Sequence, residues 1–352
     1  MLSNQLLGRC RHGLPRLLAQ FSQLAGVQPA KQIAFSFDID GQRPLYPVCF
    51  LTNGGGVTEQ AKADQLASWL GVRVTAEQVI LSHTPIRLLA AGYGSAPVLA
   101  ERRGCVADVA EAYGFRAAVT SAELAAAYPP SMLPFSSRAM PLGSAGVPIT
   151  AVFVFHDPAD WYRDLQIIVD AMTSGGVIGS RRSDMPHVPI FFSNPDMVYA
   201  DDFPTPRLGQ GAFAAAVQAV YEKVAGRPME SVNTFSKPSS LAFRLAASSL
   251  AAEAKEGGWK LRTSPEPSMG KRIRDSDLPF RAIYHVGDNI HSDIAGARAA
   301  GPPWVSVLVT ETGVWRGPGN SPEVPAYLVV SDVEAAVAAA LQRRQESLRV
   351  IG

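Results

Sequence analysis

Cysteine, net charge and long apolar runs are all scarce in this sequence. Its three cysteines, Cys10, Cys49 and Cys105, are widely spaced and form no CxxC pair. This pattern argues against a disulfide scaffold and against a zinc site, and it fits a reducing compartment. The 32 basic and 31 acidic residues nearly cancel, which gives no electrostatic basis for binding nucleic acid. No run reaches the roughly 18 apolar residues of a membrane span, so we expect no such segment.

Acidic residues are missing from the beginning of the chain, although 31 of the 352 residues are acidic. The first is Asp38, whereas the stretch from Met1 to Gly26 interleaves leucines with three arginines and a histidine. A basic, amphipathic and acid-free N-terminus is typical of a mitochondrial transit peptide. We therefore expect residues 1–30 to direct the chain to the mitochondrion, into the matrix. The alternative is an N-terminal helix without a targeting role.

Length and composition favour two compact globular units, because 352 residues exceed one comfortable core and 47% of them are hydrophobic. The first section predicts buried strands at Ile33–Phe37, Tyr46–Leu51 and Val79–Leu81. Apolar residues recur at helical spacing from Thr58 to Leu70, and Gly71 is a credible stop. This strand, helix, strand order predicts a doubly wound, mostly parallel α/β fold.

In the middle of the chain, predicted helices and strands form a separate alternation from that of the first section. It predicts, in chain order, a helix at Val106–Tyr113, a strand at Ala151–Phe155, a helix at Trp161–Met172, a strand at Pro189–Phe192 and a helix at Phe213–Val224. The last third resumes the first pattern. It predicts a helix at Leu241–Ala254, strands at Ala282–Val286, Val305–Val309 and Tyr327–Val330, and a closing helix at Val333–Leu341. The stretch Arg262–Asp277 is expected to be an exposed insertion.

Polar residues follow several of the predicted strands at the point where each strand ends. Asp38–Gly41 places two carboxylates after the first strand, and Thr52–Gly54 places a hydroxyl and backbone N–H groups after the second. Ser236–Pro238 begins a helix with a lysine, and Gly287–Asp293 places two further carboxylates after a third strand. Because such strand ends share one rim of an open α/β sheet, we expect these groups to converge.

This combination of groups suits phosphoryl transfer, in which catalysis consists mainly of positioning and charge neutralisation. A few carboxylates can hold Mg²⁺ together with substrate oxygens and water. Lys237 and the N–H groups after Thr52 can offset the remaining phosphate charge. One carboxylate can attack phosphorus to form an aspartyl-phosphate, while a second protonates the leaving oxygen and later activates water.

In this order, the four segments resemble the four motifs of the haloacid dehalogenase (HAD) superfamily. The form Thr52-Asn53-Gly54, the long insert before Lys237 and Asn194-Pro195-Asp196 are similar to class IIA of that superfamily. Phe155–Pro158 with Trp161 resembles its mitochondrial HAD-like hydrolase domain-containing 5 subgroup. The resemblance implies a Rossmann-like HAD core at 31–84 and 233–345, with an α/β class IIA cap inserted at 85–232.

Carried over residue by residue, the resemblance also assigns roles. Asp38 would be the nucleophile and a metal ligand, and Asp40 the acid/base that lends the metal a backbone carbonyl. The implied phosphate-binding residues are Thr52, Asn53, Gly54 and Lys237. Asp288 would complete the Mg²⁺ ligands, with Asn289 and Asp293 in support. We therefore expect a phosphatase for a small phosphorylated metabolite, with a homodimer through the cap as a further expectation.

One departure from the family keeps a second hypothesis open. Asp40 and Thr52 are only twelve positions apart, which leaves no room for the crossover helix that normally connects such strands. The alternative is therefore a catalytically impaired HAD-like protein that binds a ligand or partner. Dehalogenase chemistry at carbon is disfavoured, because displacement at carbon needs neither Asp40 nor the metal pair Asp288 and Asp293.

Three histidines and one turn have ordinary structural interpretations from the sequence. His83 follows a strand and His285 lies within one, so both are interpreted as structural residues. His156 with Asp157 is interpreted either as a substrate contact or as a solvated loop. Asn194–Asp196 is read physically as a turn, and only the resemblance makes it a candidate site.

Overall fold

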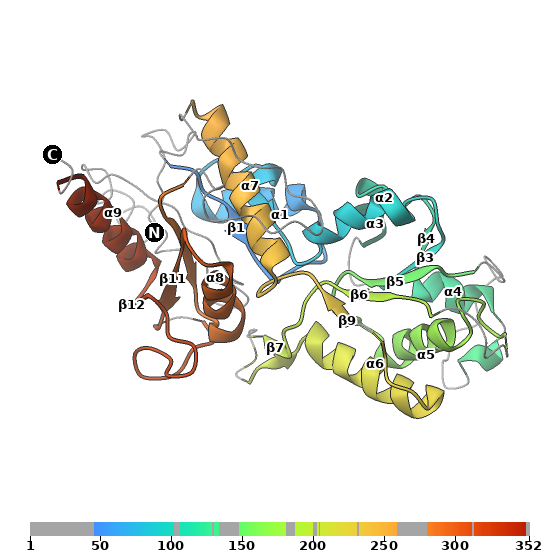
Figure 1. Cartoon of the computed structure of the whole chain (residues 1–352). Helices are drawn as coiled ribbons and strands as arrows, with labels where there is room; N and C mark the ends of the chain where they lie inside the picture. The colour runs from blue at the N-terminus through green and yellow to red at the C-terminus, as the bar shows by residue number, and fades with distance from the viewer. Residues whose placement is uncertain are drawn as a thin grey trace, which may run out of the picture.

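The computed structural model of the chain describes residues 46–101, 106–128, 130–133, 148–180, 187–199, 203, 205–230, 232–258, 280–311 and 313–349. The targeting segment expected at residues 1–30, the strand expected at Ile33–Phe37, the carboxylates Asp38 and Asp40 and the insertion at Arg262–Asp277 lie outside these residues. Figure 1 shows the described elements as two bodies side by side, which we call the core unit and the cap unit.

The core unit is assembled from two separated stretches of chain. Its first stretch contains β1 (Phe50–Leu51), α1 (Glu59–Leu70), η2 (Ala76–Gln78) and β2 (Val79–Ile80). Its second stretch contains α7 (Ser240–Glu256), β10 (Ile283–Gly287), η6 (Ile290–Ile294), α8 (Ala295–Ala300), β11 (Trp304–Val309), β12 (Leu328–Val330) and α9 (Val333–Arg349). β1 pairs with β2, and β10, β11 and β12 form a three-stranded sheet, all in parallel.

Helix α7 joins the two strand groups of the core unit. Leu51 and Ile80 from one group and Ile283 from the other belong to a single apolar cluster with its buried face. That face is rich in alanine, including Ala242 and Ala246, and such small side chains let the helix approach the strands closely. The two groups therefore share one core, as a doubly wound fold requires.

Local signals in the sequence place α1 directly after the Thr52–Gly56 loop. The Thr58 hydroxyl accepts a hydrogen bond from Ala61 N at 3.2 Å and so caps the helix start. Gly71 ends the helix with a φ of 67°, a left-handed conformation that favours glycine. The predicted helix is confirmed, and its start anchors one end of that loop.

The cap unit contains the elements between the two core stretches. In chain order they are η3 (Thr84–Leu89), α2 (Ala90–Tyr93), β3 (Val98–Glu101), α3 (Val106–Ala112), β4 (Ala118–Val119), α4 (Ser121–Ala127), η4 (Pro130–Met132), β5 (Ala151–Val154), α5 (Trp161–Thr173), β6 (Ile190–Phe192), β7 (Val198–Tyr199), β8 (Arg207–Leu208), α6 (Gln210–Ala225) and β9 (Val232–Thr234). Five of its strands form a parallel sheet in the order β4-β3-β5-β6-β9.

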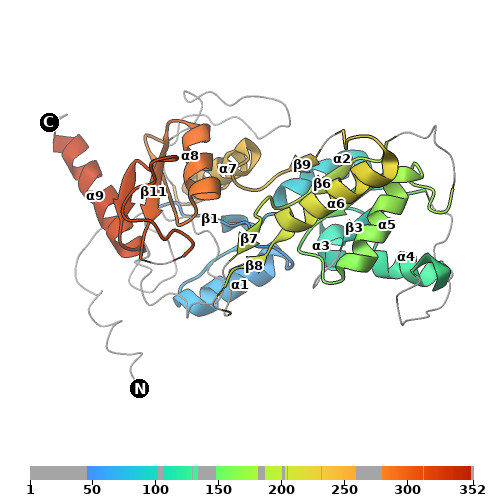
Figure 2. The ribbon, with the colours of Figure 1, turned by 90° about the horizontal axis from the view of Figure 1, so that it is seen from below.

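Both faces of the cap sheet are buried, as is typical of parallel sheets. Along β5, Val152 and Val154 pack with α5 and α6, whereas Phe153 packs with α2 and α3 on the opposite face. Figure 1 shows these two helix layers on either side of the sheet. The antiparallel β7–β8 hairpin lies at the end of the cap unit that faces the core unit (Figures 1 and 2).

The sheet topology confirms the predicted α/β fold with mostly parallel strands. The strand expected at Tyr46–Leu51 is shorter, since only Phe50–Leu51 pairs; Pro47 has no N–H to donate to a ladder. β3, β4, β9 and the hairpin were not predicted. The division of the chain at 84/85 and 232/233 stays a prediction. None of the helices in the described ranges combines the length and apolar character needed to cross a membrane.

Candidate active site

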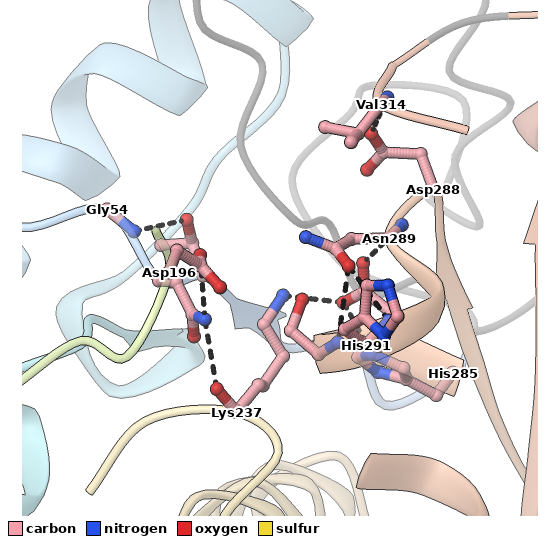
Figure 3. A network of polar contacts seen from close by, with 12 residues as sticks. Gly54, Asp196, Lys237, His285, Asp288, Asn289, His291 and Val314 are labelled. Atoms are coloured by element: carbon pink, nitrogen blue, oxygen red, sulfur yellow. Dashed lines mark hydrogen bonds and ion pairs between the residues drawn. The ribbon is translucent and has the colours of Figure 1, made fainter. Parts of the chain in front are cut away.

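Three of the predicted site segments meet where strands of the core and cap units end. Thr52–Gly54 follows β1, Asp288 and Asn289 follow β10, and Lys237 comes three residues after the end of β9. Figure 3 shows Lys237 between Gly54 and Asp196 on one side and His285 and Asn289 on the other. The predicted convergence of these segments on one rim is therefore present in the described residues.

The Thr52–Gly54 segment forms a tight polar loop. Thr52 N donates to Ile80 O at 2.9 Å, which extends the β1–β2 pairing by one residue. The Thr52 hydroxyl accepts from Gly54 N at 3.0 Å, so its own proton remains available to a ligand. Thr52 is 6% exposed and Asn53 is 3% exposed. The loop thus presents its polar groups from a nearly buried position.

Lys237 forms a buried ion pair with Asp293. Its Nζ lies 2.6 Å from Asp293 Oδ1, and both side chains are 0% exposed. His285 Nε2 lies 2.9 Å from the same oxygen, and Asn289 N donates to Oδ2 at 3.1 Å. Burial works to raise the pKa of Asp293, but the Lys237 charge and the His285 hydrogen bond hold this pKa below its ordinary value. Asp293 therefore stays ionised and keeps Lys237 in place.

The Asp288 carboxylate is oriented by the loop after β11. Val314 N donates to Asp288 Oδ2 at 2.5 Å, and Trp315 N donates to Asp288 O at 3.1 Å. Gly313 has a φ of +90°, and a Cβ there would lie 2.0 Å from Asp288 Oδ2. Only glycine fits this close approach.

Asn289 shapes the turn that brings Asp293 back to the site. Its Oδ1 accepts from His291 N at 2.9 Å and from Ser292 N at 3.3 Å. These bonds cap the start of η6, in the manner typical of asparagine at a helix N-terminus. Gly287 completes the turn, because a Cβ there would lie 2.2 Å from Asp293 Cγ.

Asp196 of the cap unit also reaches the site. From the residues alone, the segment that contains Asp196 was interpreted as a turn. Asn53 Nδ2 donates to Asp196 Oδ2 and to Lys237 O, each at 3.0 Å. Asn194 Nδ2 donates to Asn53 O at 3.0 Å, and Asn194 Oδ1 accepts from Asp196 N at 2.9 Å. Burial raises the pKa of Asp196 above its ordinary value. The only sequence signal for this contact was the Asn194-Pro195-Asp196 motif.

The histidines interpreted as structural residues also have polar partners. His285 contacts Asp293, as described above. His83 is fully buried, and its Nδ1 lies 2.8 Å from the Tyr113 hydroxyl. Tyr113 and Thr84 both donate to Glu59 Oε1, at 2.5 Å and 2.6 Å. This second polar cluster connects α1 of the core unit with the end of α3 in the cap unit.

Asp288 is the predicted magnesium ligand that falls within the described residues. Among these residues, no group of three or more histidine, cysteine or acidic side chains gathers as a metal site. Asp38 and Asp40, the other expected ligands, belong to residues 1–45, which are not described. A carboxylate oriented by the backbone N–H of Val314 at the rim offers the hard oxygen donor that Mg²⁺ prefers. The described part of the site therefore fits one side of a magnesium site.

Two family models match the chain. Residues 35–116 match the model described as haloacid dehalogenase-like hydrolase, and residues 234–336 match the model described as HAD-hydrolase-like. The two matches include all the predicted site residues from Asp38 to Gly54 and from Lys237 to Asp293.

Solved structures share this fold at low sequence identity. A possible sugar phosphatase of the HAD superfamily from Cytophaga hutchinsonii has a TM-score of 0.55, with 16% identity over 90% of this chain and 93% of its own. A glycerol phosphate phosphatase from Mycobacterium tuberculosis in complex with magnesium has a TM-score of 0.52, with 18% identity over 90% of this chain and 76% of its own. At these identities, the likeness establishes the fold.

Two curated relatives are more similar in sequence. A mitochondrial hydrolase of Saccharomyces cerevisiae is 35% identical, over 89% of this chain and 97% of its own length. A cardiolipin synthase (CMP-forming)/mitochondrial hydrolase fusion protein of Schizosaccharomyces pombe is 32% identical, over 90% of this chain but 54% of its own length. Identity above 30% across most of the sequence shows common descent, and the chain therefore belongs to the haloacid dehalogenase-like hydrolases.

Proposed function

We propose that the chain is a magnesium-dependent phosphohydrolase that acts on a small phosphorylated metabolite through an aspartyl-phosphate. The observation that carries this proposal is the buried Lys237–Asp293 pair, which contacts the Thr52–Gly54 loop through Asn53 and has the oriented Asp288 carboxylate on its other side (Figure 3). A lysine, a hydroxyl and backbone N–H groups suit a phosphate group, and a rim carboxylate suits the cation that accompanies it.

The proposed mechanism divides the work among this chain's residues. Asp38 attacks phosphorus, while Asp40 first protonates the leaving oxygen and then activates the water that releases phosphate. Thr52, Asn53, Gly54 and Lys237 hold the phosphate oxygens. Asp38, Asp40 and Asp288 would hold Mg²⁺, which neutralises charge on the phosphate when bound. Asp293 supports Lys237 through their ion pair, and Asn289 in turn donates its backbone N–H to Asp293.

The names of the structural neighbours support small phosphate esters as the substrate class. One neighbour is described as a possible sugar phosphatase and another as a glycerol phosphate phosphatase in complex with magnesium. The expectations of impaired catalysis from the short Asp40–Thr52 segment and of a homodimer through the cap stay predictions.

Turnover of a phosphate-ester panel tests the proposal. We expect the full chain to release phosphate from p-nitrophenyl phosphate, glycerol phosphate or sugar phosphates with Mg²⁺, and to lose this activity with a chelator. Asp38→Asn should abolish turnover, because an amide is not a nucleophile. Asp288→Asn should raise the magnesium requirement roughly tenfold or more, since even groups behind a metal ligand have effects of that size.

Asp64→Asn is the control, because Asp64 lies on the exposed face of α1, and it should leave turnover unchanged. Full activity in Asp38→Asn would contradict the mechanism. Absence of magnesium-dependent release from every ester would contradict the function.

We also propose a mitochondrial location, in the matrix. The names of both curated relatives include a mitochondrial hydrolase, and the acid-free basic N-terminus has the composition of a targeting segment. Residues 1–30 fused to a fluorescent reporter should therefore direct it into mitochondria. A reporter that stays in the cytosol would exclude targeting by this segment.

A further inference from the structure

The His285 side chain lies behind the candidate phosphate site and has no role in the mechanism above. It comes from β10, is 0% exposed, and places Nε2 at 2.9 Å from Asp293 Oδ1. The same carboxylate oxygen pairs with Lys237 Nζ at 2.6 Å. Figure 3 shows that His285 and Lys237 come from different elements. Asp293 Oδ1 is thus shared between the lysine and the histidine.

The direction of the His285 hydrogen bond follows from its partner. An ionised carboxylate only accepts hydrogen bonds, so Nε2 must carry the proton. Burial lowers the pKa of His285 below its ordinary value, which keeps the ring neutral at physiological pH. Phe243 and Trp304 hold the ring at centroid distances of 5.0 Å and 6.3 Å. His285 is therefore a neutral donor with a restricted orientation.

Three donors together determine how the Asp293 carboxylate is turned. Lys237 and His285 bind Oδ1, and Asn289 N binds Oδ2. Lys237 donates one of its three N–H groups to this carboxylate. The other two have no partner among the residues that the structure describes. The position of these two N–H groups depends on where Asp293 Oδ1 lies. A catalytic group displaced by about 1 Å can lose roughly a hundredfold in rate.

We propose that His285 is a positioning residue for phosphate binding: its Nε2–H holds Asp293 Oδ1, which in turn places the Lys237 ammonium. The inference rests on the proposed function, because it takes phosphate as the ligand of Lys237. The competing interpretation is that His285 only fills space between Phe243 and Trp304. The two interpretations differ in whether the N–H donor matters or only the volume.

A matched pair of variants tests the effect of the N–H donor separately from the effect of the side-chain volume. Glutamine and methionine have similar length and size, but only glutamine carries a terminal N–H that reaches the position of Nε2. The full chain and the variants His285→Gln and His285→Met are compared by calorimetric titration with inorganic phosphate in the presence of Mg²⁺. Turnover of a phosphate ester and melting temperature are measured in parallel.

We expect His285→Met to weaken phosphate binding by about 10- to 100-fold, which is the size of a hydrogen bond to a charged group. His285→Gln should stay within about threefold of the parent. Equal phosphate affinity in the two variants would overturn the proposal, as would a parent chain that binds no phosphate. If affinity separates the variants while no ester is hydrolysed, the positioning role holds and the proposed phosphatase function fails.

A measurement on the parent chain covers the case in which His285→Met does not fold. In nitrogen-15 histidine spectra between pH 6 and 8, the His285 ring should show a proton on Nε2 at every pH. The Asp293→Asn variant should alter the exchange of that proton. An Nε2 without a proton in the parent would overturn the proposal.

Discussion

Two carboxylates of the core unit differ in one respect that decides their charge. Asp293 lies at the rim where β10 ends, and Glu253 lies on α7 against the beginning of β1. Glu253 accepts hydrogen bonds from Val48 N at 2.5 Å and from Gln78 Nε2 at 2.8 Å. Both carboxylates are well supplied with donors, but among the described residues only Asp293 has a cation, Lys237, as a partner.

Their pKa values move in opposite directions. Burial raises the pKa of Glu253 to about 8, and its two neutral donors only partly oppose this. For Asp293, burial also acts to raise the pKa, but the Lys237 charge and the His285 hydrogen bond reverse the outcome. Donor hydrogen bonds alone therefore do not keep the half-buried Glu253 carboxylate ionised, whereas a buried counter-ion does so for the fully buried Asp293. Asp293 at the rim therefore keeps its charge, whereas the raised pKa of Glu253, near the beginning of β1, favours the neutral form of that carboxyl.

Removing the counter-ion should have the largest effect. Lys237→Met leaves Asp293 buried without its cation, which we expect to cost about 3–5 kcal/mol of unfolding free energy. The folded pKa of Asp293 is depressed, so its stabilising contribution is present above its ordinary value of 3.8. Urea unfolding at pH 7 should therefore show the full loss.

The exposed Lys223 provides the control for that measurement. Lys223→Met should change the unfolding free energy by less than about 1 kcal/mol. A loss of that small size in Lys237→Met would mean that the buried pair contributes little, and the contrast with Glu253 would disappear.

Neutralising Glu253 should have an intermediate effect that depends on pH. Its folded pKa is raised, so between about 4.5 and about 8 the folded chain binds more protons than the unfolded chain. The stabilisation that Glu253 contributes to the parent chain therefore falls as pH rises through that window. Glu253→Gln should remove this part of the slope of stability against pH. Melting temperatures at pH 5, 6.5 and 8 measure that slope. Glu256→Gln, at an exposed neighbour on the same helix, should keep most of the slope.

A third carboxylate, Glu59, offers the smallest test. It is held by the neutral hydroxyls of Tyr113 and Thr84 between the core and cap units. Tyr113→Phe removes one of these donors and should cost about 1–2 kcal/mol in urea unfolding. Tyr93→Phe is the matched control, because the Tyr93 hydroxyl forms no hydrogen bond with the residues that the structure describes. Equal losses in the two variants would show that the Glu59 contact contributes nothing specific.

The elements that the sequence predicted correctly carry local signals. Thr58 and Gly71 bound α1, and the apolar run before Gly287 marks β10. The polar residues after these strands were predicted to converge because parallel strands end at one rim. The contacts that were missed are not local. Asp196 contacts Asn53, which is 143 positions away in the sequence. The periodicity of the sequence does not indicate such a pairing.

His285 shows a second limit of sequence reasoning. Its place within a strand indicates burial, but a strand that is buried on both faces gives no sign of which face a residue takes. The contact with Asp293 depends on the turn that Asn289 and Gly287 make, and this geometry becomes visible only in three dimensions. The polar partner of His285 therefore escaped prediction, although its burial did not.

The short passage from β9 to Lys237 has a consequence for anyone who exchanges the cap unit for a foreign one. β9 is the edge strand of the cap sheet, and Ser236 N still bonds Ser193 O at 3.1 Å, one residue before the lysine. In a chimaera spliced immediately after β9, the end of a foreign strand would determine the position of Lys237. The Asn53 contact to Lys237 O would then be lost. Splice points before β9, between the end of α6 and Val232, keep the native strand and the lysine together.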